Sequence, residues 1–311
     1  MNFYTNEEVG LALSAQSAID ALRDAYRELA RGDAAVQVRS RIAIPAAKFS
    51  SMSAMLGGAS VAAVKMYTTL NGQFSFFIAL ISLDDGRLLA MMEADALTRL
   101  RTAATTALAA QHLARPASRS IGIFGSGVQA SAHAEMLIPR FPIEDALIRS
   151  SNVESAERFA ADLRQRFNVR VSVASAEEAA GSDIVVLATR ASTPVIQGEW
   201  LSPGSFVAAI GATRPDQREM DDETISRSAE IVVDWLEQTP AESGDLALAP
   251  PALLAARKIT DLSDVIEAGS ARQDDCAGIV VYKAVGMALQ DAAIANLVHL
   301  TLGKKATSTA S

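Results

Sequence analysis

Apolar residues recur with helical spacing at the start of the chain. Thr5-Asn6-Glu7-Glu8 is a typical helix start, and from Ser14 to Leu29 the apolar positions repeat with a period near 3.6 residues. We therefore expect two short helices there. Between Val36 and Ala90 the pattern changes to short apolar runs separated by tight-turn dipeptides such as Asn71-Gly72. These runs predict an antiparallel sheet with strands over Val36 to Ile44, Ser60 to Leu70 and Phe74 to Leu83.

Strands and helices alternate after an Ala-rich helix that we predict over Leu97 to Leu113. The predicted strands are Ser120 to Phe124, Asp145 to Ile148, Val169 to Val173, Ile184 to Ala188, Phe206 to Ile210 and Ile231 to Asp234, with helices over Val128 to Ile138, Val153 to Arg166 and Ala176 to Ala180. This order is typical of a parallel sheet with helices on both faces. Because such a doubly wound sheet would already be complete, we expect the strand and helix from Gly278 to Leu302 to leave it and pack on the N-terminal part.

The run Gly125-Ser126-Gly127-Val128-Gln129-Ala130 lies between a predicted strand and a predicted helix, where a dinucleotide-binding unit carries its phosphate loop. Gly125 permits a tight turn, Gly127 lets the backbone approach a pyrophosphate, and Ala130 is small enough for close packing of helix on strand. The alternative is a glycine turn that binds nothing. The strand and helix alternation that follows favours a cofactor loop.

No acidic residue ends the second predicted strand, where an NAD-preferring site usually holds the ribose 2′-OH. Ser150 occupies that position, and neighbouring groups could bind a 2′-phosphate: Arg149, Ser151 and Asn152. We therefore expect NADP(H) to be favoured, with NAD(H) as the alternative. We also assign Thr189, after the predicted strand that ends at Ala188, to the cofactor-binding set.

Composition narrows the class of protein. The chain of 311 residues is 50% hydrophobic and 21% charged, as expected of one or two folded domains. Its net charge of −8 argues against a nucleic-acid partner. The single cysteine, Cys276, and three scattered histidines offer no disulfide and no metal site. No apolar run is long enough to span a membrane and no secretory signal is visible, so we expect a cytoplasmic protein without a membrane partner.

Three cations lie in otherwise apolar or small-residue segments outside the predicted parallel sheet. They are Arg39, Lys65 and Arg101. Each could reach water along its aliphatic stem, and Arg101 could simply be a solvated helix residue. Because burial of an unpaired cation is expensive, three of them together instead favour a clamp for a substrate carboxylate.

These residues are part of a pattern that resembles the ornithine cyclodeaminase and mu-crystallin family almost from end to end. The resemblance is carried by Val38-Arg39, Lys65 after Met52, RTAATTALAAQHLA from Arg101, GSGVQA, GEWLSPGSFVAAIGATRPDQREMDDE from Gly198, VVDWLEQTPAESGDL from Val232, and VYKAVGMALQD near the C-terminus. It implies an α/β fold in which a doubly wound Rossmann domain, residues 116–279, is inserted into an α+β domain for substrate binding and dimerisation, residues 1–115 and 280–311. It also implies a homodimer.

The resemblance further implies functions for single residues. Arg39, Lys65 and Arg101 match positions that bind the substrate carboxylate, and Thr102 resembles a cofactor-contacting position. True cyclodeaminases carry two carboxylates where this chain has Thr213 and Ser50, so it lacks the evident proton carriers for loss of ammonia.

The departures favour NAD(P)H-dependent reduction of a small ketimine acid, such as 1-pyrroline-2-carboxylate or 1-piperideine-2-carboxylate, to the L-amino acid. Lys65 would stabilise or protonate the imine nitrogen, and Thr213 would orient a water. The alternatives are ornithine cyclodeaminase, an amino-acid dehydrogenase of the same family, and a protein that holds NADPH and a small ligand without turnover.

Overall fold

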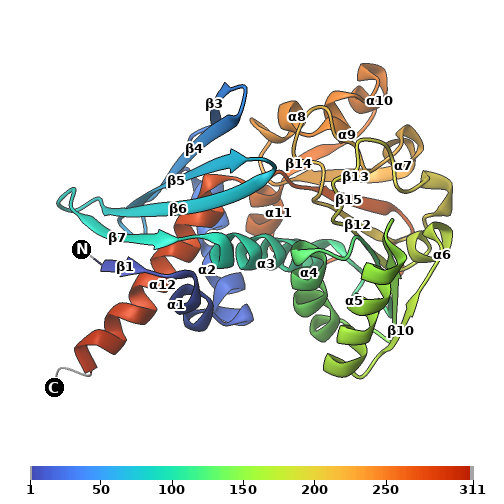
Figure 1. The fold of residues 1–311 in the computed structure, drawn as a ribbon. Helices are drawn as coiled ribbons and strands as arrows, with labels where there is room; N and C mark the ends of the chain where they lie inside the picture. Colours follow the sequence, from blue (N-terminus) through green and yellow to red (C-terminus); the bar gives the residue numbers. More distant parts are fainter. Residues whose placement is uncertain (1, 309–311) are drawn as a thin grey trace. The chain divides into compact units, whose positions relative to one another are not determined.

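The computed structural model describes residues 2–308, and its internal contacts divide the chain into two units (Figure 1). Unit 1 comprises Met1–Thr105 with Gly286–Ser311, and unit 2 comprises Thr106–Val285. The sequence placed the boundaries at residues 115 and 280 instead. The difference arises because helix α3 (Asp95–Leu113) contributes residues to both units and because the last strand belongs to unit 2.

Unit 1 is a seven-stranded sheet with helices packed on one face. Its elements are β1 (Asn2–Tyr4), α1 (Asn6–Ala12), α2 (Ala15–Arg31), β2 (Ala34–Val36), β3 (Ser40–Ile44), β4 (Ala47–Leu56), β5 (Val61–Leu70), β6 (Gln73–Ser82), β7 (Leu88–Glu93), the first part of α3, and α12 (Ala288–Ser308). The strand order is β1-β7-β6-β5-β4-β2, with β3 paired to β4. All pairs are antiparallel except β1 with β7. Helix α12 packs against α2, β4 and β5.

The two expected N-terminal helices are confirmed, each with a capping side chain: Thr5 accepts from Glu8 N and Ser14 accepts from Ser17 N. The expected single strand from Val36 to Ile44 is wrong. It is split into β2 and β3, which leaves Arg39 in the connection. Strand β4 was not predicted, because the prediction followed continuous apolar runs. The alternation of Ser51 and Ser53 with buried apolar residues is nevertheless a strand pattern.

The two faces of the unit 1 sheet differ. On β5, burial alternates along the strand so that Val61, Ala63, Lys65 and Tyr67 share the buried face. Residues directly paired across strands lie on the same face, so the register places one set of exposed apolar side chains on the opposite face: Ile42, Ile44, Phe49, Met55, Leu70 and Phe77. We call this set the open face.

Unit 2 is a Rossmann-type sheet of eight parallel strands in the order β10-β9-β8-β11-β12-β15-β13-β14. Its strands are β8 (Ser120–Phe124), β9 (Asp145–Arg149), β10 (Arg170–Val173), β11 (Ile184–Leu187), β12 (Phe206–Ala209), β13 (Ser228–Val233), β14 (Ile259–Asp261) and β15 (Ile279–Lys283). Its helices are α4 (Val128–Leu137), η1 (Ile138–Arg140), α5 (Val153–Arg166), α6 (Ala176–Ala180), η2 (Gly198–Trp200), α7 (Asp222–Arg227), α8 (Thr239–Glu242), α9 (Gly244–Ala247), α10 (Pro251–Ala255) and α11 (Leu262–Ala268), together with the end of α3.

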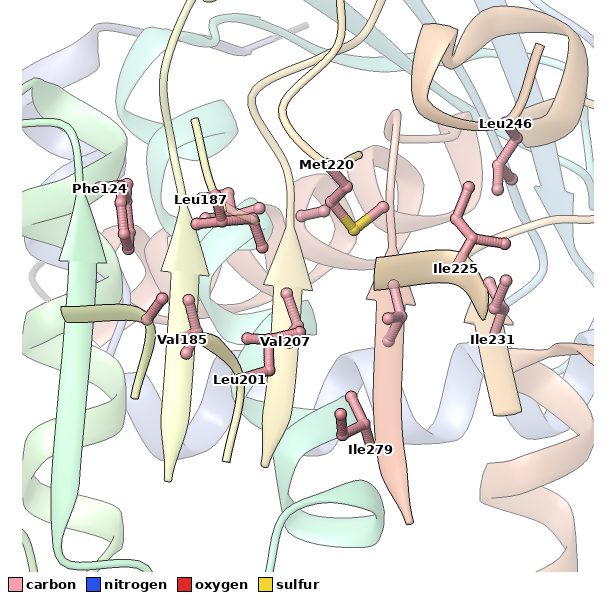
Figure 2. Packing of buried hydrophobic residues seen from close by; sticks show 14 of the residues in the cluster. Phe124, Val185, Leu187, Leu201, Val207, Met220, Ile225, Ile231, Leu246 and Ile279 are labelled. Atoms are coloured by element: carbon pink, nitrogen blue, oxygen red, sulfur yellow. The ribbon is translucent and has the colours of Figure 1, made fainter. Parts of the chain in front are cut away.

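The predicted α/β class and the doubly wound parallel sheet are confirmed, but the expected path of the tail is wrong. Strand β15 pairs with both β12 and β13 and therefore completes the parallel sheet, so that α12 alone leaves it. All five residues of β15 are buried, which is the requirement for a central strand covered on both faces. Figure 2 shows part of the apolar layer on this sheet, from Phe124 on β8 through Val185 and Val207 to Ile231.

The strand order creates a switch point beside β8. The chain runs outward from β8 through β9 to β10 and then returns to place β11 on the other side of β8. Open parallel sheets bind ligands outside the carboxyl ends of their strands at such a point. The loops that follow β8, β9, β11 and β12 therefore form the candidate cofactor site of unit 2.

Candidate functional site

The turn after β8 has the geometry of a phosphate loop. Gly125 has φ +107°, and a Cβ there would lie 2.5 Å from the carbonyl oxygen of Ala188. Its amide donates to the carbonyl oxygen of Arg149 at 2.8 Å. Only glycine suits a position with this torsion and these neighbours. Gly125 thus brings the loop after β8 close to the ends of β9 and β11.

Gly127 and helix α4 fit a pyrophosphate. Gly127 is the N-cap of α4, and a Cβ there would meet no atom within 4 Å. The free N–H groups of the first helical turn and the positive end of the helix dipole therefore open onto space that an anion can fill. Ala130 is fully buried, as expected for close packing of the helix on the sheet. The remaining members of the predicted loop, Ser126, Val128 and Gln129, lie in this turn and at the start of the helix.

The end of β9 carries polar groups and no acid. Ser150 follows the strand directly, and Ser126 Oγ donates to Ser150 Oγ at 3.2 Å, which joins this position to the phosphate loop. Arg149 and Ser151 are exposed. Asn152 caps α5 by accepting from Ser155 N at 2.8 Å. In dinucleotide-binding folds, the end of this strand is where the 2′ position of the adenosine ribose is recognised.

The loops after β11 and β12 are joined by a carboxylate that the sequence did not single out. Thr189 donates from both its amide and its hydroxyl to Glu219 Oε1, each at 2.7 Å. The amides of Gly211 and Ala212 donate to Glu219 Oε2 at 2.7 and 3.0 Å. Thr213 is the half-buried residue that follows Ala212. The hydroxyl of the predicted cofactor residue Thr189 is therefore bonded within the protein.

Behind Glu219 lies a buried ion pair. Lys283 Nζ is 2.9 Å from Asp245 Oδ2, and both side chains are fully buried. Asp245 Oδ1 accepts from the amides of Glu219 and Met220 at 2.7 and 2.9 Å. Burial raises the pKa of Glu219, while the charge of Lys283 and the donors of Thr189 act in the opposite direction. Residues 219 and 220 are thereby tied to β15.

In unit 1, the structure brings the predicted clamp residues together around Asp291. Lys65 is 2% exposed, and its Nζ lies 2.8 Å from Asp291 Oδ1 and 2.7 Å from Thr98 Oγ1. Arg101 Nε donates to the same Asp291 oxygen at 3.2 Å, and its Nη1 donates to Gln290 Oε1 at 2.6 Å. Lys65 and Arg101 are thus buried and paired, which rules out the alternative that they extend to water.

Arg39 joins this cluster through the backbone of Gly286. Arg39 Nη2 donates to the carbonyl oxygen of Gly286 at 2.7 Å, and a Cβ at Gly286 would lie 2.7 Å from Arg101 Nη1. The neighbouring Thr102 directs its hydroxyl to the carbonyl oxygen of Thr98 at 2.7 Å. We refer to Arg39, Lys65, Arg101 and Asp291 as the cationic cluster.

Within the cationic cluster, two buried cations, Lys65 and Arg101, share the carboxylate of Asp291. Three charged groups act on the Lys65 ammonium: the anion Asp291 and the cations Arg101 and Arg39. Burial lowers the pKa of Lys65 to about 8, although Asp291 acts to raise it. Burial also acts to raise the pKa of Asp291, but Arg101 and Lys65 hold it below its usual value. Two buried cations that share one carboxylate favour the binding of a further small anion.

Two other sequence expectations concern metals and membranes. Among the residues that the structure describes, no group of three or more His, Cys, Asp or Glu side chains could hold a metal ion. Over the same residues, every helix is too short or too polar to cross a lipid bilayer.

The chain belongs to the ornithine cyclodeaminase/mu-crystallin family, whose model matches residues 1–305. The predicted resemblance is confirmed. Among curated relatives, the ketimine reductase mu-crystallin of Mus musculus is 33% identical over 310 residues, which cover 96% of each chain.

Solved structures agree with this assignment. A probable ornithine cyclodeaminase from Bordetella pertussis has a TM-score of 0.92, 40% identity and 98% coverage of each chain. The Delta(1)-pyrroline-2-carboxylate reductase of Thermococcus litoralis, solved with NADH and L-proline, has a TM-score of 0.91, 28% identity and 98% coverage of each chain. An archaeal alanine dehydrogenase dimer with bound NAD also has a TM-score of 0.91 and 28% identity, covering 98% of this chain and 97% of its own.

Proposed function

We propose that this protein is an NAD(P)H-dependent reductase that converts a small ketimine acid, of the 1-pyrroline-2-carboxylate or 1-piperideine-2-carboxylate type, into the L-amino acid. The observation that carries the proposal is the cationic cluster, in which the buried Lys65 and Arg101 converge on the single carboxylate of Asp291. A cyclic imine that bears one carboxylate would supply a second anion for these two buried cations. The mouse ketimine reductase and the archaeal pyrroline carboxylate reductase support the choice of substrate class.

The chain would bind and orient the substrate, and bound NAD(P)H would supply the hydride. Arg39, Lys65 and Arg101 would hold the carboxylate, and the two arginines can each offer two parallel N–H donors. The imine carbon receives the hydride and the imine nitrogen receives a proton. Lys65 Nζ, fixed by Asp291 and Thr98, is the proposed proton donor to that nitrogen. Thr213 would orient a water molecule.

The reductase is favoured over a cyclodeaminase because residues 50 and 213 are not acids. Ser50 is buried on β4 and Thr213 lies in the loop after β12, where true cyclodeaminases carry acids. Glu219 cannot replace the acid at 213, because both of its oxygens already accept two hydrogen bonds each. An amino-acid dehydrogenase and a protein that binds NADPH and a small ligand without turnover remain as alternatives for the assay below.

We further propose that NADP(H) is favoured over NAD(H). Ser150 with Arg149, Ser151 and Asn152 provides a cation and hydroxyl or amide groups where an acid would select NAD(H). The acid nearest in sequence, Asp145, lies at the start of β9 and is bonded to Arg170 Nε and Nη2, each at 2.6 Å. It is therefore unavailable to a ribose at the other end of the strand.

We also propose a homodimer in the cytoplasm. The open face presents six exposed apolar side chains on one side of the unit 1 sheet, and Ile42 and Ile44 are each 68% exposed. Exposed apolar patches of this kind mark interaction sites. The archaeal alanine dehydrogenase of the same fold is a dimer. The lone, exposed Cys276 suits a reducing compartment.

Substrate class can be tested directly. We expect steady loss of NADPH absorbance with 1-pyrroline-2-carboxylate or 1-piperideine-2-carboxylate, and no reaction with L-ornithine. Proline formed from ornithine without net change in the cofactor would identify a cyclodeaminase. NADH production from alanine would identify a dehydrogenase, and binding without turnover in all assays would identify a binding protein.

The clamp predicts a pH dependence that can be assigned to Lys65. Lys65 is charged below about pH 8 and loses its charge as the pH rises through that value, so kcat/KM for the ketimine should fall above about pH 8. In Lys65→Met, kcat/KM should drop by about 10²-fold or more, and this step of the profile should disappear. The exposed Lys258→Met variant should retain the wild-type profile. A variant at residue 65 with an unchanged KM and pH profile would refute the clamp.

Cofactor preference should depend on Ser150. In Ser150→Asp, we expect kcat/KM with NADPH to fall and the NADH/NADPH ratio to rise by about tenfold or more, because the new carboxylate repels a 2′-phosphate and accepts from a 2′-OH. Ser270→Asp, in an exposed loop, adds the same charge as a control. An unchanged ratio would show that the 2′ position of the ribose is recognised elsewhere.

The proposed dimer should depend on the open face. Light scattering should give twice the subunit mass of 32.7 kDa for the wild-type protein and a monomer for the double variant Ile42→Glu/Ile44→Glu. Leu248→Glu, at an equally apolar exposed site in unit 2, should remain dimeric. A wild-type monomer, or a dimer that survives the double substitution, would exclude this interface.

A further inference from the structure

Glu219 is a buried carboxylate whose hydrogen bonds are all made to loops of the candidate cofactor site. Its side chain is fully buried. Oε1 accepts from the amide and hydroxyl of Thr189, and Oε2 accepts from the amides of Gly211 and Ala212. Four donors satisfy the acceptor sites of a buried carboxylate, and here they come from two separate loops. This side chain therefore fixes the backbone of two separate loops.

Both loops lie at the same edge of the sheet as the phosphate loop. Thr189 follows β11 and Gly211 follows β12, and β8, β11 and β12 are consecutive neighbours in the sheet. The opposite side of the switch point, after β9, carries Ser150 and its polar neighbours. A dinucleotide that crosses the switch point with its adenosine half over β9 places its nicotinamide half over β11 and β12.

The two loops are also as close as their backbones allow. A Cβ at Gly211 would lie 2.2 Å from the carbonyl oxygen of Thr189 and 2.5 Å from Glu219 Oε1. A side chain at residue 211 would therefore separate the loops. The amides of Glu219 and Met220 donate to Asp245, which forms an ion pair with Lys283 on β15. The backbone of Glu219 is thus anchored to the central sheet through Asp245, and its carboxylate is bonded to the two loops.

We propose that Glu219 is a positioning residue for the nicotinamide half of the cofactor site: it holds the loops at Thr189 and at Gly211 to Thr213 in one fixed arrangement. This inference rests on the dinucleotide part of the proposed function and is independent of the substrate. Because the adenosine half lies over β9 and the phosphate loop, loss of the Glu219 contacts should affect only ligands that carry the nicotinamide.

The experiment compares two ligands that differ by the nicotinamide ring. The cofactor is whichever of NADH and NADPH binds more tightly. NADH is compared with ADP-ribose, and NADPH with 2′-phospho-ADP-ribose. The dissociation constants of the cofactor and of its truncated ligand are measured by calorimetry. Glu219→Gln keeps the size of the side chain but turns an amide NH2 group towards two of the four donors. We expect nicotinamide cofactor affinity to fall by about tenfold or more and the affinity of the truncated ligand to stay within about twofold.

Two further variants make the result specific. Glu199→Gln is the same substitution at an exposed site of unit 2 and should change neither affinity. Thr189→Val removes the hydroxyl donor to Glu219, together with the acceptor for the Ala191 amide. It should reproduce the selective loss to a smaller extent, which keeps the test valid if Glu219→Gln does not fold. A variant that retains its affinity for the truncated ligand has a folded unit 2. Comparison of the two ligands in the same variant therefore separates a loss of positioning from general destabilisation.

Other results would overturn either the role of Glu219 or the dinucleotide site itself. Equal losses for both ligands in Glu219→Gln and Thr189→Val, or no loss for either, would overturn the assignment of Glu219. A wild-type protein that bound neither ligand would overturn the dinucleotide site itself. Failure of ketimine turnover alone would refute the proposed reaction and would leave the positioning result unaffected, because no substrate is present in the binding experiment.

Discussion

The cost of burying charge constrains unit 1 more than any other interaction. Lys65 and Arg101 lie on the covered side of an antiparallel sheet, where an unpaired cation would be strongly destabilising. Asp291 compensates both from helix α12, and removal of one partner from such a buried pair typically costs about 3–5 kcal/mol. The position of α12 on the sheet therefore depends on this pairing. Because the two cations share a single carboxylate, the same site also suits a further anion.

A second buried charge group organises unit 2 by the same principle. Lys283 and Asp245 form an ion pair within the parallel sheet, and Asp245 in turn fixes the backbone from which Glu219 reaches the cofactor loops. In both units a C-terminal residue compensates a charge that an earlier segment buries, with Asp291 acting in unit 1 and Lys283 in unit 2. Buried ions here set the geometry of sites, while the apolar layers in Figure 2 supply most of the burial that stabilises the sheet.

The sequence predicted the features that depend on short stretches of chain. Gly125 and Gly127 could be recognised because a strand, a glycine turn and a helix follow one another directly. The roles of Asp291 and Glu219 could not be predicted in this way, since Asp291 meets Lys65 across 226 residues and Glu219 meets Thr189 across 30. Strand β15 was assigned to the wrong unit because an apolar run indicates burial without indicating which sheet buries it. The resemblance to a family identified Arg39, Lys65 and Arg101, yet it did not reveal that Lys65 and Arg101 share the carboxylate of Asp291.

The position of β15 between β12 and β13 has a consequence for biosynthesis. On the ribosome, β13 and β14 have no neighbouring strand to join them to the earlier part of the sheet until residues 279–283 have emerged. The covered face of the unit 1 sheet likewise waits for α12. Domains usually fold in the order of their synthesis, but here both cores are completed by the same late segment. The strands that β15 joins, and the face of the unit 1 sheet that α12 covers, therefore gain their last neighbours only when residues 279–308 have been synthesised.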